Sequence, residues 1–156
     1  MGVPFLPYET YGRSPLENSS FLVSSANFNE KIHGKGFVAR LSGSTAEFLQ
    51  MWELMMNGEK LFTMQDGVLT FKLAPAIPAY LVKDDGKVEA TLFGKIKVVY
   101  DCGGKRDLIP GQYAVKGYKL VTADGSARTV DAAVVSGEAA QDIRDGKIAE
   151  IRVNIA

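Results

Sequence analysis

Hydrophobic side chains between residues 45 and 57 predict an α-helix that is apolar on nearly every side. Ser44 and Glu47 stand at capping-box spacing at its start, and Gly58 follows as a stop signal. A helix with apolar side chains all round is buried in a folded protein, so we expect other elements to cover this one. Its large apolar residues are Phe48, Leu49, Met51, Trp52, Leu54, Met55 and Met56.

Beyond Gly58 the hydrophobic pattern changes to a period of two, which predicts β-strands. One apolar and one polar face per strand is typical of an antiparallel sheet that is wet on one side. The apolar positions of the four clearest strands are Leu69, Phe71 and Leu73; Ile96, Val98 and Tyr100; Tyr118 and Leu120; and Ile151, Val153 and Ile155. The turn signals between strands are Asp85-Gly86, Gly103-Gly104, Asp124-Gly125 and Asp145-Gly146.

These elements together predict a mainly β fold. We expect an antiparallel β-sandwich with one long buried α-helix and one short C-terminal helix, and a barrel is the alternative. The short helix is predicted over 137–144, with Ser136 as its cap and Gly146 as its exit. Residues 1–60 form a loop-rich segment plus the helix at about 45–57, and residues 61–156 form the C-terminal sandwich domain.

Length and charge exclude several classes of protein. A chain of 156 residues makes one ordinary domain, or a small domain with part of a larger one. Its 18 basic and 18 acidic residues cancel without a basic cluster, so nucleic acid is not an expected partner. No apolar run is long enough for a membrane span, and the N-terminus lacks the pattern of a signal peptide. The lone Cys102 is expected to be a structural thiol in a reducing, cytoplasmic compartment.

Few residues offer catalytic chemistry. His33 is the only histidine and lies in a flexible, hydrophilic stretch, so a loop histidine is the favoured interpretation over a ligand contact. A zinc site with two histidines is excluded within one chain. No motif pairs two carboxylates for glycoside cleavage. We therefore assign no catalytic residue and no metal ligand, and we expect no cofactor.

One polar cluster remains, at the start of the predicted helix. A helix N-terminus presents free backbone N–H groups and a positive dipole end, which together favour an anion or a hydroxyl-rich ligand. On the local sequence alone, the favoured interpretation is that these residues only cap the helix and form a tight turn. The candidate phosphate- or sugar-binding residues are Arg40, Ser42, Gly43, Ser44 and Thr45.

The same stretch resembles a known family. The run from Arg40 to Pro78 resembles the junction between barrel and sandwich in inverting glycoside phosphorylases of the cellobiose phosphorylase type (glycoside hydrolase family 94). There a Thr-Gly turn precedes the last barrel helix, which ends in Gly and is followed by a strand and a Pro-x-Ile-Pro bend. Here the bend reads Pro75-Ala76-Ile77-Pro78, and bracketing by prolines argues against a central strand. Likeness to long bacterial relatives of this family extends over almost the whole chain.

The resemblance implies a fold and a function. Members of the family have an (α/α)6 catalytic barrel followed by a C-terminal antiparallel β-sandwich. Their Thr-Gly turn binds inorganic phosphate, the co-substrate of phosphorolysis, and that role falls here on Ser42 and Gly43, with Ser44 or Thr45 as alternates. The family's aspartate general acid lies in the barrel, upstream of this stretch. The chain is therefore expected to be a C-terminal domain without a complete catalytic site.

Three functions remain open on the sequence. The first is the C-terminal domain of a carbohydrate-active enzyme, whose partner is the catalytic barrel, or a second copy joined through the apolar helix. The second is a stand-alone carbohydrate-binding module that stacks sugars on aromatic side chains, although packing in the core is the favoured role for these residues. The third is a purely structural or dimerisation module. The aromatic candidates are Tyr80, Tyr100, Tyr113 and Tyr118.

Overall fold

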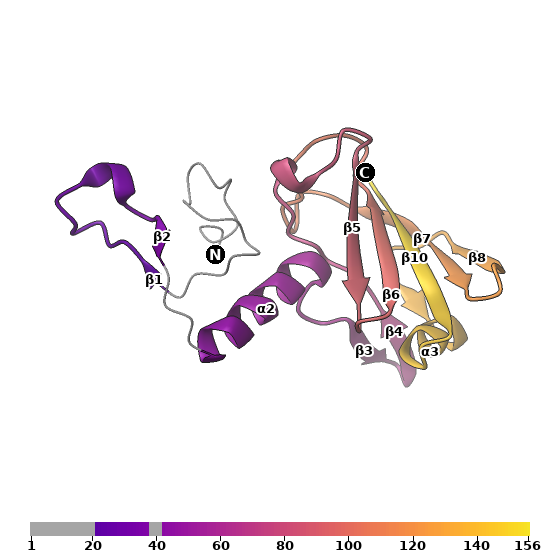
Figure 1. Cartoon of the computed structure of the whole chain (residues 1–156). Helices are drawn as coiled ribbons and strands as arrows, with labels where there is room; N and C mark the ends of the chain where they lie inside the picture. The colour runs from indigo at the N-terminus through magenta and orange to yellow at the C-terminus, as the bar shows by residue number, and fades with distance from the viewer. Residues whose placement is uncertain (1–20, 38–41) are drawn as a thin grey trace. The chain divides into compact units, whose positions relative to one another are not determined.

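The computed structural model describes residues 21–37 and 42–156, with the backbone alone at 21–22, 36–37 and 42–45 (Figure 1). The chain divides into two compact units, Met1–Trp52 and Glu53–Ala156. The boundary falls inside helix α2 (Ser42–Asn57), so the first unit contains the start of this helix and the second its end.

The described part of the first unit is small. Strand β1 (Phe21–Leu22) pairs antiparallel with β2 (Gly36–Phe37), and the 3-10 helix η3 (Glu30–Ile32) lies between them. Two backbone hydrogen bonds extend the pair, from Val23 N to the Lys35 carbonyl and from Gly34 N to the Val23 carbonyl, both 2.9 Å. Residues in this stretch, which was predicted as part of a loop-rich segment, thus form a short hairpin with a helical turn.

The second unit is a β-sandwich of two sheets, which confirms the mainly β class. The larger sheet has the order β5-β6-β10-β7-β8, and the smaller has the order β3-β4-β9. The larger sheet is built from β5 (Lys87–Leu92), β6 (Ile96–Asp101), β7 (Val115–Thr122), β8 (Ala127–Val130) and β10 (Ile148–Ile155). The smaller is built from β3 (Phe62–Gln65), β4 (Val68–Phe71) and β9 (Val135–Ser136).

The larger sheet is mixed, which corrects the expectation of a wholly antiparallel one. Strand β10 runs antiparallel to β7 but parallel to β6, with Ile151 opposite both Val98 and Leu120. Parallel neighbours need a crossover connection between them. The chain makes it here through β7, β8, β9 and helix α3 (Glu138–Arg144) before β10 enters the middle of the sheet.

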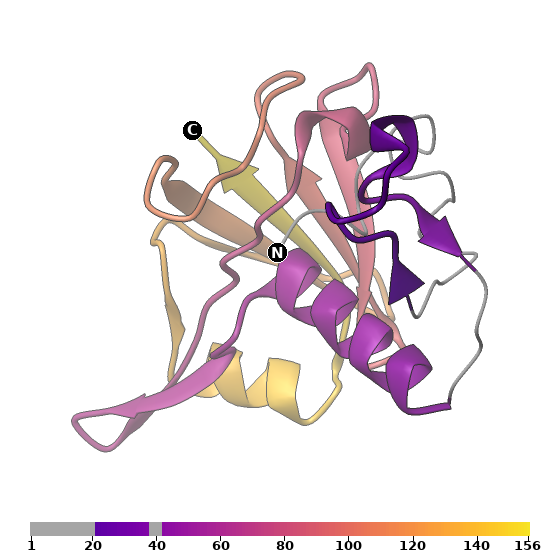
Figure 2. The same cartoon turned by 90° about the vertical axis from the view of Figure 1, so that its left-hand side faces the viewer.

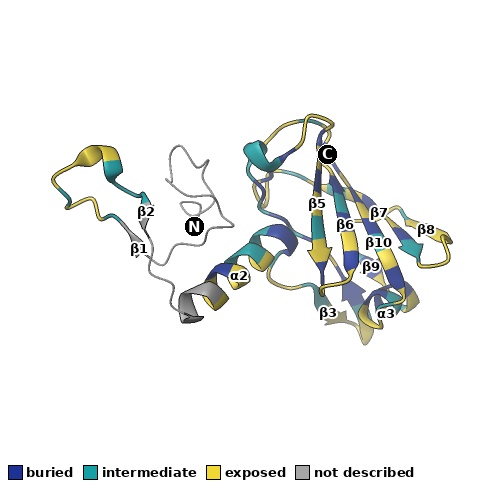
Figure 3. Cartoon of the chain, in the orientation of Figure 1, coloured by how far each residue is buried: buried dark blue, intermediate teal, exposed yellow. Residues whose placement is uncertain are grey.

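The core lies between the two sheets. Side chains alternate between buried and exposed along the strands of the larger sheet, as the dark blue and yellow stripes of Figure 3 show. Phe71 of β4 meets Tyr118 of β7 with ring centroids 6.3 Å apart, and this contact joins the sheets. Helix α3 adds Ala140 and Ile143, both fully buried. The predicted period-two faces of β6, β7 and β10 are confirmed.

Two helix predictions need correction. Helix α2 begins at Ser42, so Ser44 lies inside its first turn and not at the N-cap position. Its burial is also partial, since Leu49 is 59% exposed and Leu54 is 36% exposed. The remaining exposed residues of this helix include the polar Glu47, Gln50 and Glu53, so the hydrophilic positions gather on one side.

Helix α3 was predicted to be capped by Ser136, and this is wrong. Ser136 belongs to β9, opposite Thr70 of β4, and Gly137 takes the N-cap position with φ of 63°. Only glycine adopts that region readily, which lets the strand turn at once into the helix. Its N–H donates to the Leu69 carbonyl at 2.8 Å and so keeps the turn attached to β4.

Candidate functional site

The predicted anion site lies at the edge of what the structure describes. Arg40 falls outside the described residues. Ser42, Gly43, Ser44 and Thr45 form the first turn of α2, and only their backbone is described. The first four N–H groups of an α-helix have no partner within the helix, which is the basis of the expected anion binding. The site therefore stays a prediction.

At the C-terminal end of α2, each of the last four backbone carbonyls accepts a hydrogen bond from a residue of the second unit. The last four carbonyls of a helix lack intrahelical partners and need donors from elsewhere. Here each has one: Leu54 accepts from Gly58 N at 2.9 Å, Met55 from Ala76 N at 2.7 Å, Met56 from the Tyr100 hydroxyl at 2.7 Å, and Asn57 from Ala74 N at 3.0 Å. Gly58 directly follows the helix, so the sandwich holds the end of this helix through the other three hydrogen bonds, from Ala74, Ala76 and Tyr100.

Local sequence explains why the chain returns to the helix end. Gly58 has φ of 95°, and a Cβ there would lie 3.0 Å from Ala74, so this position needs glycine for both conformation and space. Alternate residues of the following segment, Ala74 and Ala76, donate to the helix. Pro75 lies between them, where its missing N–H costs no hydrogen bond, and its carbonyl accepts from the Tyr113 hydroxyl at 2.7 Å.

Two of the four tyrosines considered for sugar stacking belong to the core, and the other two, Tyr80 and Tyr113, are half-buried. Tyr100 is fully buried and Tyr118 is 2% exposed, so neither presents a ring face to a ligand. The Tyr118 hydroxyl accepts from Leu73 N and donates to the Ala133 carbonyl, both at 3.2 Å. Burial raises the pKa of Tyr100 well above its usual value, raises that of Tyr118, and raises that of Tyr113 to about 12. The favoured prediction that these residues pack in the core is confirmed for Tyr100 and Tyr118.

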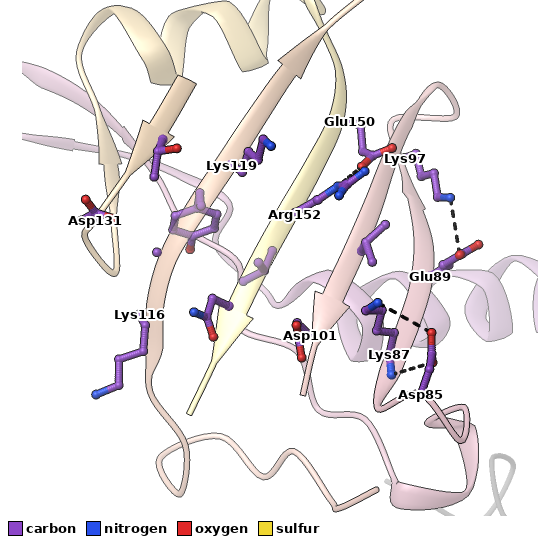
Figure 4. A pocket seen from close by; sticks show the side chains of 16 residues that line it. Asp85, Lys87, Glu89, Lys97, Asp101, Lys116, Lys119, Asp131, Glu150 and Arg152 are labelled. Carbon is purple, nitrogen blue, oxygen red and sulfur yellow. Dashed lines mark hydrogen bonds and ion pairs between the residues drawn. The ribbon is translucent and has the colours of Figure 1, made fainter. Parts of the chain in front are cut away.

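A hollow lies on the outer face of the five-stranded sheet (Figure 4). It has a volume of about 650 Å³ and opens widely to solvent. Strand alternation puts polar side chains on this face, since each residue next to a buried one points outward. Register aligns them in rows, so that Glu89, Val99, Arg152 and Lys119 lie side by side across β5, β6, β10 and β7.

Opposite charges on this face are largely paired with each other. Glu89 forms ion pairs with Lys83 at 3.6 Å and Lys97 at 3.4 Å, and Arg152 contacts Glu150. Lys83 and Lys97 hold the pKa of Glu89 below its usual value, so this carboxylate stays ionised. A carboxyl group that donates a proton to a glycosidic oxygen needs the opposite shift. Glu89 is therefore unsuited to general acid catalysis.

Several polar side chains of the hollow have no described partner. They come from β7, β10 and the residue after β8, and Figure 4 shows Lys116 and Asp131 on the side away from Glu89. Two are amines, one is a carboxylate and one is an amide, so the group offers both donors and acceptors. They are Lys116, Lys119, Asp131 and Asn154.

The surroundings of Cys102 and His33 indicate structural roles for both side chains. Cys102 is fully buried, and desolvation raises the pKa of its thiol, which disfavours the reactive thiolate. This confirms the expected structural thiol. His33 ends the helical turn η3, and its Nε2 lies 2.7 Å from the Asn27 carbonyl. Over residues 21–37 and 42–156, no three metal-ligating side chains come together as an ion site.

The fold and the site define a mainly β, sandwich-like unit that caps the end of a helix and carries a polar outer face. Comparison with family models, curated proteins and solved structures gives no match to this chain. No helix in the described part of the chain is long and apolar enough to cross a membrane.

Proposed function

We propose that the second unit is the accessory β-sandwich of a carbohydrate-active enzyme of the glycoside phosphorylase type. In this proposal it holds the C-terminal end of α2, and the catalytic site needs a barrel domain that supplies the general acid. The sandwich then serves to fix the position of the helix, and only the assembled enzyme catalyses the reaction. The sugar-containing substrate and inorganic phosphate are its expected ligands.

The observation that carries this proposal is the set of three hydrogen bonds from Ala74, Ala76 and Tyr100 to the end of α2. Two of the donors, Ala74 and Ala76, belong to the segment around Pro75-Ala76-Ile77-Pro78, on which the resemblance rests. That sequence feature thus has a physical task, because it satisfies helix carbonyls that would otherwise be buried without donors. A junction built in this way supports a domain whose role is to fix a helix.

The carboxylates of the sandwich support a role without proton transfer. Two carboxylates of the sandwich, Glu89 and Asp124, have pKa values below their usual range. Asp124 receives hydrogen bonds from Thr122 and Ser126 in the turn after β7, which stabilises its charged form. Glycoside phosphorolysis by an inverting route needs an acid that is still protonated near neutral pH, which these two groups do not supply.

Phosphate is the proposed ligand of the other end of α2. The candidates Arg40, Ser42, Gly43, Ser44 and Thr45 would contribute a cation, hydroxyls and backbone N–H groups. Calorimetry with inorganic phosphate tests this directly. Binding that is lost in Arg40→Gln and weakened in Ser42→Ala would support the assignment, with the surface variant Lys72→Gln as a matched control. No measurable heat at millimolar phosphate would contradict it.

Turnover assays test the wider proposal. The chain is incubated with phosphate and β-linked glucosides, and sugar phosphate release is measured. We expect none from the chain alone, and release on adding a separately expressed barrel domain of the phosphorylase family would support the proposal. Measurable turnover by the chain alone would refute it. A gene for such a barrel beside this one would be independent support.

A carbohydrate-binding module is the second candidate, favoured by the polar hollow. Lys116, Lys119, Asp131 and Asn154 offer donors and acceptors of the kind that sugar hydroxyls need. Titration with glucan oligosaccharides, followed by amide NMR shifts, distinguishes the two. Shifts confined to β7 and β10 and lost in Lys119→Ala would favour the module. Unchanged spectra at millimolar sugar would leave the accessory role as the better account.

A further inference from the structure

The outer edge of strand β3 is open to pairing with another strand. Strand β3 is the end strand of the sheet β3-β4-β9, and no other strand of the described chain pairs with its outer side. Exposed strand edges in native proteins are usually blunted by charges, prolines or bulges. The edge strands of the larger sheet follow this rule, since β5 carries Lys87 and Glu89 and β8 carries Arg128. Strand β3 reads FTMQ and carries no charge.

Register shows which backbone groups of β3 are free. Lys72 N donates to the Leu61 carbonyl at 3.0 Å, so Leu61 faces β4. Backbone groups along an antiparallel strand turn alternately toward one neighbour and away from it. Thr63 and Gln65 therefore also face β4, whereas Phe62 and Met64 point their N–H and carbonyl groups to the outer edge. In Figure 2 the β3–β4 hairpin projects from the rest of its unit, which leaves this edge accessible.

Exposed apolar side chains accompany this edge. Met64 is 62% exposed and lies on the same face of β3 as Phe62. Phe93 is 50% exposed and stacks on Phe62, with ring centroids 6.1 Å apart and planes 14° apart. Phe93 has φ of 52°, a left-handed conformation that bulky residues rarely adopt. The three side chains form one apolar patch, which we call the β3 patch (Phe62, Met64 and Phe93).

We propose that the β3 edge binds the β3 edge of a second copy of this chain in antiparallel register about a two-fold axis through Thr63. In this register Phe62 lies opposite Met64 of the partner, and these are the two residues whose backbone groups are free. Each Phe62–Met64 pair gains two backbone hydrogen bonds and a contact between sulfur and aromatic ring. Both pairs lie on the face of the β3 patch, which extends across the dimer.

Charge complementarity favours a second copy of this chain as the partner, and it favours this register. Lys60 stands two residues before Phe62, and Asp66 stands two residues after Met64; both are exposed. With Thr63 on the axis, Lys60 of one chain lies near Asp66 in the turn after β3 of the other, and the arrangement occurs twice. Opposite charges near each other across a strand pair stabilise it, whereas like charges destabilise it. A shift by one residue would place Lys60 opposite Gly67 and turn the free backbone groups away from each other.

The first test measures the oligomeric state of the full chain. Sedimentation velocity over a concentration series is expected to show a reversible dimer. Met64→Lys should raise the dimer dissociation constant about tenfold or more, because it introduces a charge into the centre of the pairing. Lys60→Glu should weaken the dimer by placing like charges near Asp66, whereas Lys72→Glu makes the same charge change just after β4, away from this edge, and should leave it unchanged. Circular dichroism and thermal melting check that each variant is folded.

The second test reads the register directly. Residues on the axis form a pair without hydrogen bonds, whose Cα atoms lie about 4.5 Å apart, within the range that a disulfide spans. Thr63→Cys should therefore cross-link the dimer on mild oxidation. Gln65→Cys is the control, because its two copies would lie about 14 Å apart. The native Cys102 is buried and does not compete.

Two results would overturn the proposal. The first is a chain that remains monomeric at every concentration. The second is a dimer that is unaffected by Met64→Lys and is not cross-linked by Thr63→Cys, which would assign the contact to another surface such as α2. Neither result bears on the accessory function, which is tested by turnover and phosphate binding.

Discussion

The hydroxyl of Tyr100 gives the sharpest test of how the sandwich holds helix α2. It donates to the Met56 carbonyl at 2.7 Å in a buried position, and Tyr100 and Met56 are 0% and 3% exposed. Tyr100→Phe removes this donor and keeps the ring in the core. Water has little access to replace it, so the carbonyl is left without a partner.

The expected cost follows from the chemistry of a buried acceptor. A hydrogen bond that can be replaced by water contributes about 0.5–1.5 kcal/mol, whereas a buried group left unsatisfied costs about 1–3 kcal/mol. We therefore expect Tyr100→Phe to lower the free energy of unfolding by about 2 kcal/mol. Total stabilities of domains are about 5–15 kcal/mol, so the loss is readily measured.

Urea denaturation of the wild type and of two variants measures this cost. Tyr113→Phe is the matched control, because its hydroxyl makes a bond of the same length, 2.7 Å, to the Pro75 carbonyl from a half-buried position. Tyr113 is more exposed than Tyr100, so water can replace its hydroxyl more easily, and the loss in Tyr113→Phe should be the smaller one. Amide exchange adds a local readout: protection of Ala74 and Ala76, whose N–H groups bond to α2, should fall in Tyr100→Phe more than protection of Ile151 in β10.

A loss below about 0.5 kcal/mol in Tyr100→Phe would refute the reasoning, because it would show that the Met56 carbonyl has another donor or reaches water. A larger loss in Tyr113→Phe than in Tyr100→Phe would refute it as well. Unchanged exchange at Ala74 and Ala76, together with a global loss of stability, would show that the hydroxyl supports the core and does not secure the helix end.

Two further predictions concern the sandwich as a whole. Burial raises the pKa of Tyr100, Tyr113 and Tyr118, so above pH 10 the unfolded chain releases protons that the folded chain keeps, and stability should fall by about 1.4 kcal/mol per pH unit for each tyrosine. Denaturation midpoints that stay constant between pH 9 and 11 would contradict this. Gly117→Ala should destabilise by about 1–3 kcal/mol, because its Cβ would lie 2.7 Å from the backbone carbonyl of Val130; an unchanged melting temperature would show that β8 moves aside at no cost.

The sequence was informative wherever structure depends on neighbours along the chain. Period-two alternation located the apolar faces of β6 and β10 because each residue's direction follows from the one before it. Gly86 and Gly125 located turns because both need positive φ. Strands β3, β5, β8 and β9 were not among the four strands predicted from the sequence. Strands β3 and β8 are the harder two to predict. Each has four residues, and β8 is mostly exposed, so neither has the alternation that marks a half-buried strand.

Features that depend on distant residues could not be read from local pattern. The partner of the Met56 carbonyl is 44 residues away, and the contact of Leu73 with the Tyr118 hydroxyl spans 45. The same limit explains the mixed sheet, since nothing within β10 indicates that it lies between β6 and β7. A sequence pattern predicted that Tyr100 and Tyr118 are core residues, but it could not show that their hydroxyls connect separate parts of the fold.

The hydrogen bonds that hold the end of α2 and the proposed pairing of β3 involve different backbone groups, so each can be tested without disturbing the other. The helix end is held by donors that the sandwich supplies internally, and these bonds are complete without a partner. The β3 edge is the reverse case, because Phe62 and Met64 keep backbone groups that bond to no described strand. Loss of the Tyr100 hydroxyl should therefore lower stability without changing the dimer constant at concentrations where the chain stays folded. A charge at Met64, which is mostly exposed, should weaken the dimer and leave the stability of the monomer nearly unchanged.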